Sequence, residues 1–359
     1  MNTQIAFAES RVSQLLKCQY PILLAGMGGV ARSELVAAVS NAGGFGFLGM
    51  VRESPALISQ EISSVREKTE RPFGVNLIPA ATDQDLLEAE IAACMEEKVF
   101  SVGLFWDLSD ALVRRLVDHG ILVVCQVGSV SEAVAAQEAG AALIVAQGVE
   151  AGGHVRGQLK ALELIQEVSR NVDVPIVAAG GISTGKHIFD AFTAGAEGTM
   201  IGTAFIATEE SFAHPYHKQR IVDADSDATI LTTDFHINWP RDAKVRVLRN
   251  SVTNGDHGDP NTRPLKVIGN EEGRPIYLFS TDSPLRSMSG DFEAMALYAG
   301  VGSRLVRDIK PAAQVVHSLA VEFAEASSKS VPVNDDFENE PVELASSPCY
   351  AADFDAPSI

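Results

Sequence analysis

The feature that most constrains the fold is a series of eight short apolar runs in the N-terminal part of the chain. Successive runs begin roughly 21 to 33 residues apart, which leaves room for one strand and one crossover helix each. Strands that are apolar on both faces belong to parallel sheets covered by helices. The runs are PILLA from Pro21, FGFLG from Phe45, FGVNL from Phe73, VFSVGLF from Val99, ILVVCQV from Ile121, ALIVAQG from Ala142, PIVAAGG from Pro175 and GTMIGTA from Gly198.

Four of the segments between these runs end in the same way. NAGGFGF, DHGILVV, EAGAALI and TAGAEGTMI each place a glycine shortly before the next apolar run. Glycine at this place is typical of a helix C-cap, because it adopts the left-handed conformation without a steric penalty. Eight strand–helix units of this kind predict a (β/α)8 TIM barrel, with a smaller second domain inserted after it.

One motif favours a different α/β fold. GMGGVA, at Gly26 to Ala31, matches the permissive dinucleotide-binding fingerprint between a strand and a helix. A doubly wound sheet of that class has about six strands and needs an acidic residue for the ribose, for which Glu53 is a loose candidate. The strand count therefore favours the barrel.

Composition excludes several classes of function. The formal net charge is -19, from 28 Lys and Arg against 47 Asp and Glu, and no basic stripe interrupts it, so nucleic acid is not an expected partner. No apolar run approaches the ~18 residues that a membrane span needs. The cysteines lack a C-x-x-C pair, which favours a reducing, cytoplasmic location. They are Cys18, Cys94, Cys125 and Cys349.

The pattern of the chain changes after the eighth run. We expect a barrel over residues 1–212, an inserted substrate-side domain over 213–290, and helices that return to the barrel over 291–327. Residues 328–359 are acidic, aperiodic and rich in Pro and Ser, which predicts a disordered tail.

Small, glycine-rich turns follow the seventh and eighth predicted strands. Barrels bind ligands at the carboxyl ends of their strands, and a phosphate group is commonly held at these two turns. Backbone N–H groups hold the phosphate, and glycine lets it approach them. The alternative is that the glycines only permit tight turns. We interpret the turns as a phosphate site made by Gly180, Gly181, Met200, Ile201, Gly202 and Thr203.

Amide side chains close three other strands, at Asn76, Gln126 and Gln147. Buried amides need partners, and a flavin ring offers both donors and acceptors. The first turn, AGMGG with Met27, would let the backbone approach such a ring. The alternative is that each amide stabilises its own turn. We prefer cofactor contact for Asn76 and Gln147, whereas the two interpretations stand level for Gln126.

His154 lies in the segment GVEAGGH, directly after Gly152 and Gly153 and beyond the sixth strand. A flexible glycine loop here would carry the imidazole to the face of the ligand. A histidine can take and give a proton near neutral pH, which suits a general base beside a redox cofactor. His214 and His217 have metal-ligand spacing, but no third ligand accompanies them, so we expect a helix-start role and no metal.

Several of these segments together resemble the nitronate monooxygenase family, formerly called 2-nitropropane dioxygenases. They are PILLAGMGGVARSELVAAVSNAGGFGFLG, RPFGVNL, AQGVEAGGHVRG, VPIVAAGGI, MIGTAF and LYAGVGS, in this order over roughly residues 15–325. The resemblance implies an FMN-binding barrel that oxidises alkyl nitronates, or nitroalkanes, with dioxygen to a carbonyl compound and nitrite, without a nicotinamide. It implies His154 as the catalytic base. It implies FMN contacts at Asn76, Gln147, Gly152, Gly181 and Met200 to Thr203.

Two departures from the family pattern concern the substrate. Relatives often read QAPMAGG after the first strand, where this chain reads LLAGMGG. Relatives often end the fourth strand with SFGLP, where Phe105 and Trp106 here predict a more aromatic wall. In the returning segment MALYAGVGS, Tyr298 is a candidate for the substrate wall, with ordinary helix packing as the alternative.

Rival functions remain open from the sequence. EAGGH, AAGGI and AHPYHKQRI also resemble the FMN-dependent enoyl-acyl-carrier-protein reductase, which would use NADH. Inosine-monophosphate-type dehydrogenase chemistry needs a nucleophilic cysteine after the sixth strand, and that crossover has none. The non-enzyme alternative is a barrel that binds flavin or a phosphorylated metabolite as a sensor. The physiological substrate and the oligomeric state are left open.

Overall fold

The computed structural model describes Phe7 and residues 10–240, 242–260 and 265–329. Most of the predicted acidic tail, residues 330–359 with Cys349, lies outside this part. Cys18, Cys94 and Cys125 are free thiols.

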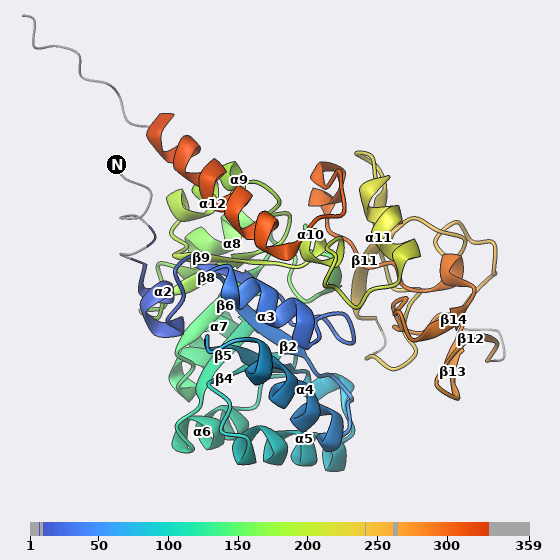
Figure 1. The fold of residues 1–359 in the computed structure, drawn as a ribbon, viewed down its shortest axis with the longest axis horizontal. Helices are drawn as coiled ribbons and strands as arrows, with labels where there is room; N and C mark the ends of the chain where they lie inside the picture. Colours follow the sequence, from blue (N-terminus) through green and yellow to red (C-terminus); the bar gives the residue numbers. More distant parts are fainter. Residues whose placement is uncertain (1–6, 8–9, 241, 261–264, 330–359) are drawn as a thin grey trace, which may run out of the picture.

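The eight predicted strands form one closed parallel barrel (Figure 1). Its closing pair is β1 with β9, in which Leu23 lies beside Met200. Closure confirms the barrel and excludes the doubly wound alternative, whose sheet is open. The strands are β1 (Ile22–Leu24), β2 (Phe45–Gly49), β3 (Gly74–Leu77), β4 (Ser101–Phe105), β5 (Leu122–Val127), β6 (Leu143–Gln147), β8 (Ile176–Ala179) and β9 (Gly198–Ile201).

Helices cover the outside of the barrel between the strands. The four glycines expected to end helices, Gly43, Gly120, Gly140 and Gly195, all have φ between 76° and 112°. This is the left-handed region that a C-cap requires, so the turn prediction is confirmed. The helices are α3 (Ser33–Asn41), α4 (Pro55–Lys68), α5 (Gln84–Glu96), α6 (Asp110–Asp118), α7 (Val130–Ala139), α8 (Ala161–Val168), α9 (Gly185–Thr193) and the short α10 (Thr203–Ile206).

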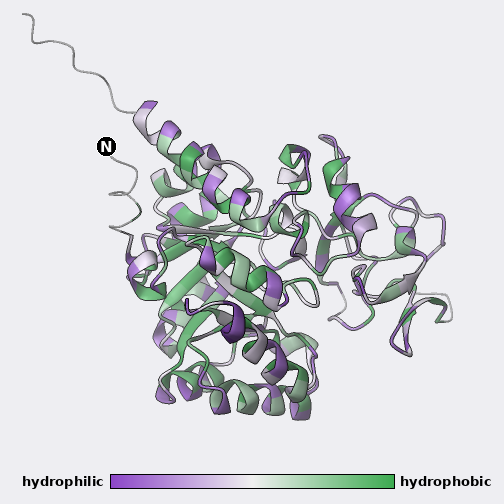
Figure 2. Cartoon of the chain, in the orientation of Figure 1, coloured by the Kyte–Doolittle hydropathy of each residue, from purple (hydrophilic) through white to green (hydrophobic). Residues whose placement is uncertain are grey.

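The barrel has an inner and an outer apolar core. Phe45, Phe47 and Val145 fill the interior, and α2 (Arg11–Leu16) closes the N-terminal end by inserting Val12 and Leu16 into this cluster. The outer core lies between the strands and the helices. Figure 2 shows hydrophobic colour along the barrel strands and hydrophilic colour on outward helix faces. Because α2 closes the N-terminal end of the barrel, a ligand is expected at the open end, where the carboxyl ends of the strands lie.

Two small antiparallel sheets stand at the carboxyl rim, and one of them begins inside the barrel chain. β7 (Gly153–Val155) leaves β6 and pairs with β11 (Lys244–Leu248), so that His154 lies opposite Val245. β10 (Thr229–Thr232) completes this sheet, and β12 (Val267–Glu271), β13 (Arg274–Tyr277) and β14 (Met288–Gly290) form the other. The prediction of a flexible loop around His154 was therefore wrong, because ladder hydrogen bonds hold this segment as a strand.

The segment after residue 290 is less helical than predicted. Two 3-10 turns, η2 (Phe292–Ala294) and η3 (Val301–Leu305), flank an extended stretch, and only α12 (Ala312–Lys329) is a long helix. α12 returns to the barrel and packs on α9 and α3 (Figure 1). It includes Ser328 and Lys329, the first residues of the predicted tail. Within the described ranges, no helix combines the length and the apolar character needed to cross a membrane.

Candidate active site

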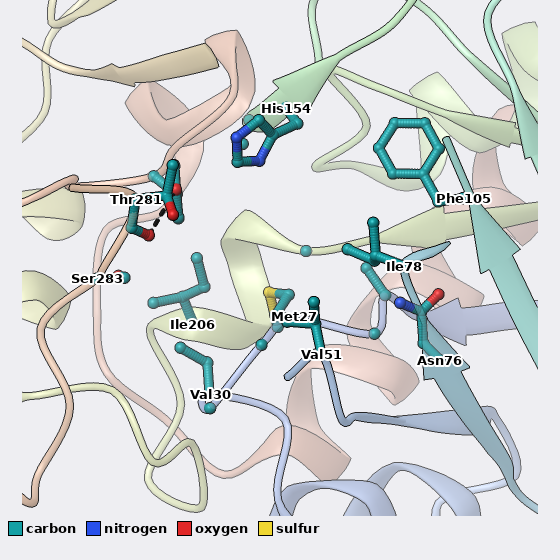
Figure 3. A pocket seen from close by; sticks show the side chains of 18 of the residues that line it. Met27, Val30, Val51, Asn76, Ile78, Phe105, His154, Ile206, Thr281 and Ser283 are labelled. Atoms are coloured by element: carbon teal, nitrogen blue, oxygen red, sulfur yellow. Dashed lines mark hydrogen bonds between the residues drawn. The ribbon is translucent and has the colours of Figure 1, made fainter. Parts of the chain in front are cut away.

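A cavity of about 730 Å³ opens at the carboxyl ends of the barrel strands. This volume is in the range of small-molecule and cofactor sites. Figure 3 shows His154 across the cavity from Met27 and Val51, with Thr281 and Ser283 on a separate wall. Every site residue predicted from the sequence lines this cavity: Met27, Asn76, Gln126, Gln147, Gly152, Gly153, His154, Gly180, Gly181, Met200, Ile201, Gly202, Thr203 and Tyr298.

The two glycine turns after β8 and β9 present backbone to the cavity. Gly180 and Gly181 have φ of 108° and 73°, a conformation that residues with a Cβ rarely adopt. A Cβ on Gly202 would meet only the Met27 sulfur at 3.4 Å and the Ala25 Cβ at 3.7 Å, so the space beside it is open to a ligand. Gly202 also begins α10 as its N-cap residue.

A third turn, which was not predicted from the sequence, joins these two. Gly300 donates its N–H to the Thr203 hydroxyl at 3.0 Å. A Cβ on Gly302 would lie 2.2 Å from the Ser183 hydroxyl and 3.0 Å from the Gly181 carbonyl oxygen, so only glycine fits. The three turns together form a cradle of backbone with few side chains. The segment LYAGVGS contains Gly300 and Gly302. The residues that they contact, Thr203 and Ser183, lie far away in the sequence, and no local pattern indicates these contacts.

Asn76 and Gln126 extend the polar lining along the cavity. Their side-chain amides make no hydrogen bond to any residue in the described part of the chain. Asn76 packs against the first turn, where a Cβ on Gly26 would lie 2.2 Å from the Asn76 Cβ. Polar groups that face a cavity without protein partners are suited to a polar ring system.

Gln147 is engaged differently from the other two amides. It is buried, its Nε2 donates to the His154 carbonyl at 2.9 Å, and its Oε1 accepts from the Arg156 N–H at 3.4 Å. From the end of β6, the side chain thus hydrogen-bonds to the backbone on both sides of Val155, the last residue of β7. This contact is of the turn-stabilising kind, and the same side chain also lines the cavity, so cofactor contact by Gln147 stays a prediction.

Aromatic rings surround the imidazole of His154. The Trp239 ring stacks on it, with centroids 3.4 Å apart and planes 16° apart. Trp106 meets it edge to face at 6.3 Å, and Tyr298 lies at 5.8 Å. His154 Nε2 is buried and has no hydrogen-bond partner among the described residues. A nitrogen without a protein partner in this position is available to a substrate.

The environment keeps His154 uncharged. Burial lowers the pKa of His154 well below its ordinary value of 6.5, because the charged imidazolium is poorly solvated there. The nearby Arg52 guanidinium lowers this pKa further by like-charge repulsion. At neutral pH the ring is therefore a neutral imidazole, the form that accepts a proton.

Tyr298 lies in extended chain rather than in a helix. Its hydroxyl donates to the Thr281 carbonyl at 2.7 Å, and its own carbonyl accepts from His217 Nε2 at 3.0 Å. His217 is buried, and its Nδ1 accepts from the Ser283 hydroxyl at 3.2 Å. His214 caps α11 (Pro215–Val222) by accepting the Tyr216 N–H, which confirms its helix-start role. In the described ranges no three His, Cys, Asp or Glu side chains are grouped as metal ligands.

A buried carboxyl group supports the turn after β2. Glu90 of α5 is fully buried and accepts the Glu53 N–H at 3.0 Å. Burial raises the pKa of Glu90 to about 8. Neither Glu90 nor Trp239 was predicted, because each acts through contacts with residues far away in the sequence.

The fold and the cavity define a (β/α)8-barrel enzyme with its site at the carboxyl rim. The model of the nitronate monooxygenase family matches residues 9–91 and 80–322, and the chain belongs to this family. Membership implies a flavin cofactor, and the protein is a flavin-dependent oxidoreductase.

Individual relatives agree with this assignment. A probable nitronate monooxygenase of Staphylococcus haemolyticus is 33% identical over 270 residues, which cover 63% of this chain and 75% of that protein. One from Staphylococcus aureus strain Newman is 30% identical over 340 residues, covering 83% and 92%.

Two solved structures share the fold. FabK from Thermotoga maritima superposes with a TM-score of 0.76 at 31% identity, covering 89% of this chain and 98% of that one. A nitroalkane oxidase from Streptomyces ansochromogenes has a TM-score of 0.71 at 30% identity, covering 89% and 99%. The family and the second structure support oxidation of nitro compounds.

The raised pKa of Glu90 predicts a pH dependence of stability. Between the unfolded value of 4.5 and the folded value of about 8, the folded protein holds a proton that the unfolded chain has lost. This contribution to stability is complete below pH 4.5 and is lost as pH rises toward 8, with a slope of up to ~1.4 kcal/mol per pH unit. Glu90→Gln should flatten the decline between pH 5 and 8, as measured by urea unfolding. Parallel pH profiles of the two proteins would contradict the assignment.

Proposed function

We propose that this enzyme oxidises alkyl nitronates, and nitroalkanes after deprotonation, with bound FMN and dioxygen, to a carbonyl compound and nitrite. The observation that supports this most directly is the neutral imidazole of His154, which lies between aromatic rings above a cavity lined by glycine backbone. A nitroalkane needs a base for its α-proton, and the cavity offers one.

The cavity fits FMN in two respects. The backbone cradle at Gly181, Gly202 and Gly302 suits a phosphate, and the unpaired amides of Asn76 and Gln126 suit the polar edge of the ring. Met27 and Gly153 complete the walls beside the ring. When bound, FMN would accept electrons from the substrate and pass them to dioxygen. The protein's own groups bind the substrate, orient it and move its proton.

His154 is the proposed base. As the α C–H bond of the nitroalkane breaks, the imidazole takes the proton and the bond electrons move into the nitro group, leaving a nitronate. Aromatic packing fixes the ring plane, and Gln147 holds the backbone of the same residue. A preformed nitronate has already lost this proton and needs no base.

We expect His154→Ala to retain FMN and to lose about 10²- to 10⁴-fold in kcat/KM with nitroethane, which is the usual contribution of a positioned base. The loss with ethylnitronate should be much smaller. Because the pKa of His154 lies well below 6.5, wild-type kcat/KM with nitroethane should stay flat from pH 8 down to about 6.5. Oxygen-consumption assays check both results. A wild-type rate with nitroethane in the alanine variant would remove His154 from the mechanism.

The phosphate cradle gives a second prediction. Gly181→Val or Gly202→Val should abolish FMN binding, because a side chain would occupy the ligand's approach to the backbone. Gly120→Val is the matched control, since Gly120 has φ of 76° against 73° at Gly181 but lies at the far end of the barrel. Flavin absorbance per protein should fall in the first two variants and stay near wild type in the third. Full flavin content in all three would refute the placement.

Tyr298 is proposed as part of the substrate wall, beside His154. Tyr298→Phe keeps the ring but leaves the Thr281 carbonyl without its donor. We expect FMN content to be unchanged and KM for ethylnitronate to change by about two- to tenfold, since one hydrogen bond is lost at the wall. Unaltered kinetics would assign Tyr298 to packing alone.

The second candidate is the FMN- and NADH-dependent reduction of an enoyl-acyl-carrier-protein thioester. It is favoured by the segments that resemble that reductase, because EAGGH and AAGGI line the cavity and AHPYHKQRI places His217 behind Tyr298. Anaerobic stopped-flow spectroscopy separates the two. Bleaching of the flavin by ethylnitronate supports the proposal, whereas bleaching by NADH with reoxidation by an enoyl thioester supports the reductase.

A further inference from the structure

Three arginines line the cavity, and two of them are neutralised within it. Arg32 pairs with Glu53 at 2.9 Å. Arg274 pairs with Glu271 at 2.6 Å and with Asp282 at 3.0 Å. Arg52 makes no ion pair with any carboxylate in the described part of the chain, and its Nη1 donates to the Asn238 carbonyl at 3.2 Å.

The carboxylates that line the cavity are either paired with other arginines or exposed to solvent. Glu53, Glu271 and Asp282 are the partners of Arg32 and Arg274, and Glu272 is exposed to solvent. Solvent screens an exposed charge, so Glu272 does little to offset Arg52. The guanidinium of Arg52 is therefore the uncompensated cation of the cavity among the described residues.

The backbone at Arg52 is held in an unusual conformation. Arg52 has φ of 59°, which is uncommon for a residue with a side chain and persists where the surroundings hold it. The next residue, Glu53, donates its N–H to the buried Glu90 at 3.0 Å. Glu90 is thus placed to hold the turn that directs Arg52.

The charge of Arg52 acts on the side chains around the proposed base. Burial is the larger influence on both neighbours, lowering the pKa of His154 and raising the pKa of Tyr298, and the Arg52 guanidinium adds a smaller lowering of each. Because His154 is neutral, its imidazole supplies no positive charge to an anionic substrate. An anionic substrate in the cavity therefore needs a positive charge from a side chain other than His154.

We propose that Arg52 binds the anionic end of the substrate and that Glu90 positions it by holding the turn after β2. This inference rests on the proposed function, since a nitronate shares its negative charge over two oxygens of one plane. The planar guanidinium can donate to both oxygens at once, as it does to a carboxylate. The same contact stabilises the charge that develops on a nitroalkane as His154 takes its proton.

Steady-state kinetics test the role of Arg52. Arg52→Gln should raise KM for ethylnitronate about 10- to 100-fold, the range of a charge-assisted hydrogen bond. With nitroethane, KM should change less than about threefold while kcat falls, because charge appears only in the transition state. Arg66→Gln removes the same charge from an exposed ion pair with Glu97 and should leave both substrates unaffected. An unchanged KM for ethylnitronate in Arg52→Gln would overturn the proposal.

A binding measurement separates this inference from the proposed reaction. Propionate is a planar two-oxygen anion, and propionamide is its neutral counterpart. The two tryptophans of the chain, Trp106 and Trp239, both contact His154, so their fluorescence reports on the cavity. In the FMN-loaded enzyme, Arg52→Gln should weaken propionate about 10- to 100-fold and leave propionamide unchanged. Equal propionate affinity in both proteins refutes the anion site, whereas failure of nitronate turnover in wild type refutes only the reaction.

The positioning role of Glu90 has its own test. Glu90→Gln keeps an oxygen that accepts the Glu53 N–H, and Glu90→Ala removes it. Glu90→Ala should weaken propionate in the direction of Arg52→Gln with propionamide unchanged, and Glu90→Gln should restore wild-type affinity. If the alanine variant fails to fold, the glutamine variant still decides, because a loss of propionate affinity there contradicts positioning by the hydrogen bond.

Discussion

Closure of the barrel is the constraint on which the rest of the structure depends. When β1 pairs with β9, all eight strands must end at one rim, and the residues that follow them are brought together from distant parts of the sequence. Asn76 and Gly202 meet in one cavity for this reason alone. α2 fills the other end with Val12 and Leu16, so that a ligand has a single rim at which to bind.

The second constraint joins His154, the proposed base, to the small sheets. β7 carries His154 and pairs with β11, while Gln147 brackets the same strand from the barrel side. Directly after β7, Arg156 lies 4.8 Å from the Trp106 ring centroid and pairs with Asp107 at 3.2 Å and Glu132 at 2.8 Å. Trp106 and Asp107 both have positive φ, and these contacts of Arg156 help to hold them in that conformation. The position of His154 is therefore fixed by the barrel and by the added sheet together.

These two constraints differ in how well the sequence reveals them. A strand buried on both faces is a continuous apolar run, so β1 to β6, β8 and β9 can be predicted from local pattern, as can glycines such as Gly140 that end helices. β7 has only three residues, and its partner lies far along the chain, so no periodicity marks it. The contact of Gln147 with β7 depends on side-chain hydrogen bonds to the backbone, which no local pattern indicates. Trp239 and Glu90 act through tertiary contacts that composition does not encode.

The charges of the cavity follow one physical requirement. A base that works at neutral pH must be uncharged before reaction, and burial between Trp239 and Tyr298 achieves this for His154. The same burial would leave an anionic substrate without a counter-charge, since desolvated charges need partners. A guanidinium is suited to this place because it stays protonated even where nearby charges and burial depress the pKa of histidine. Placing the proposed base on β7 and the proposed anion-binding cation on the turn after β2 would let the pKa of the one and the position of the other be set independently.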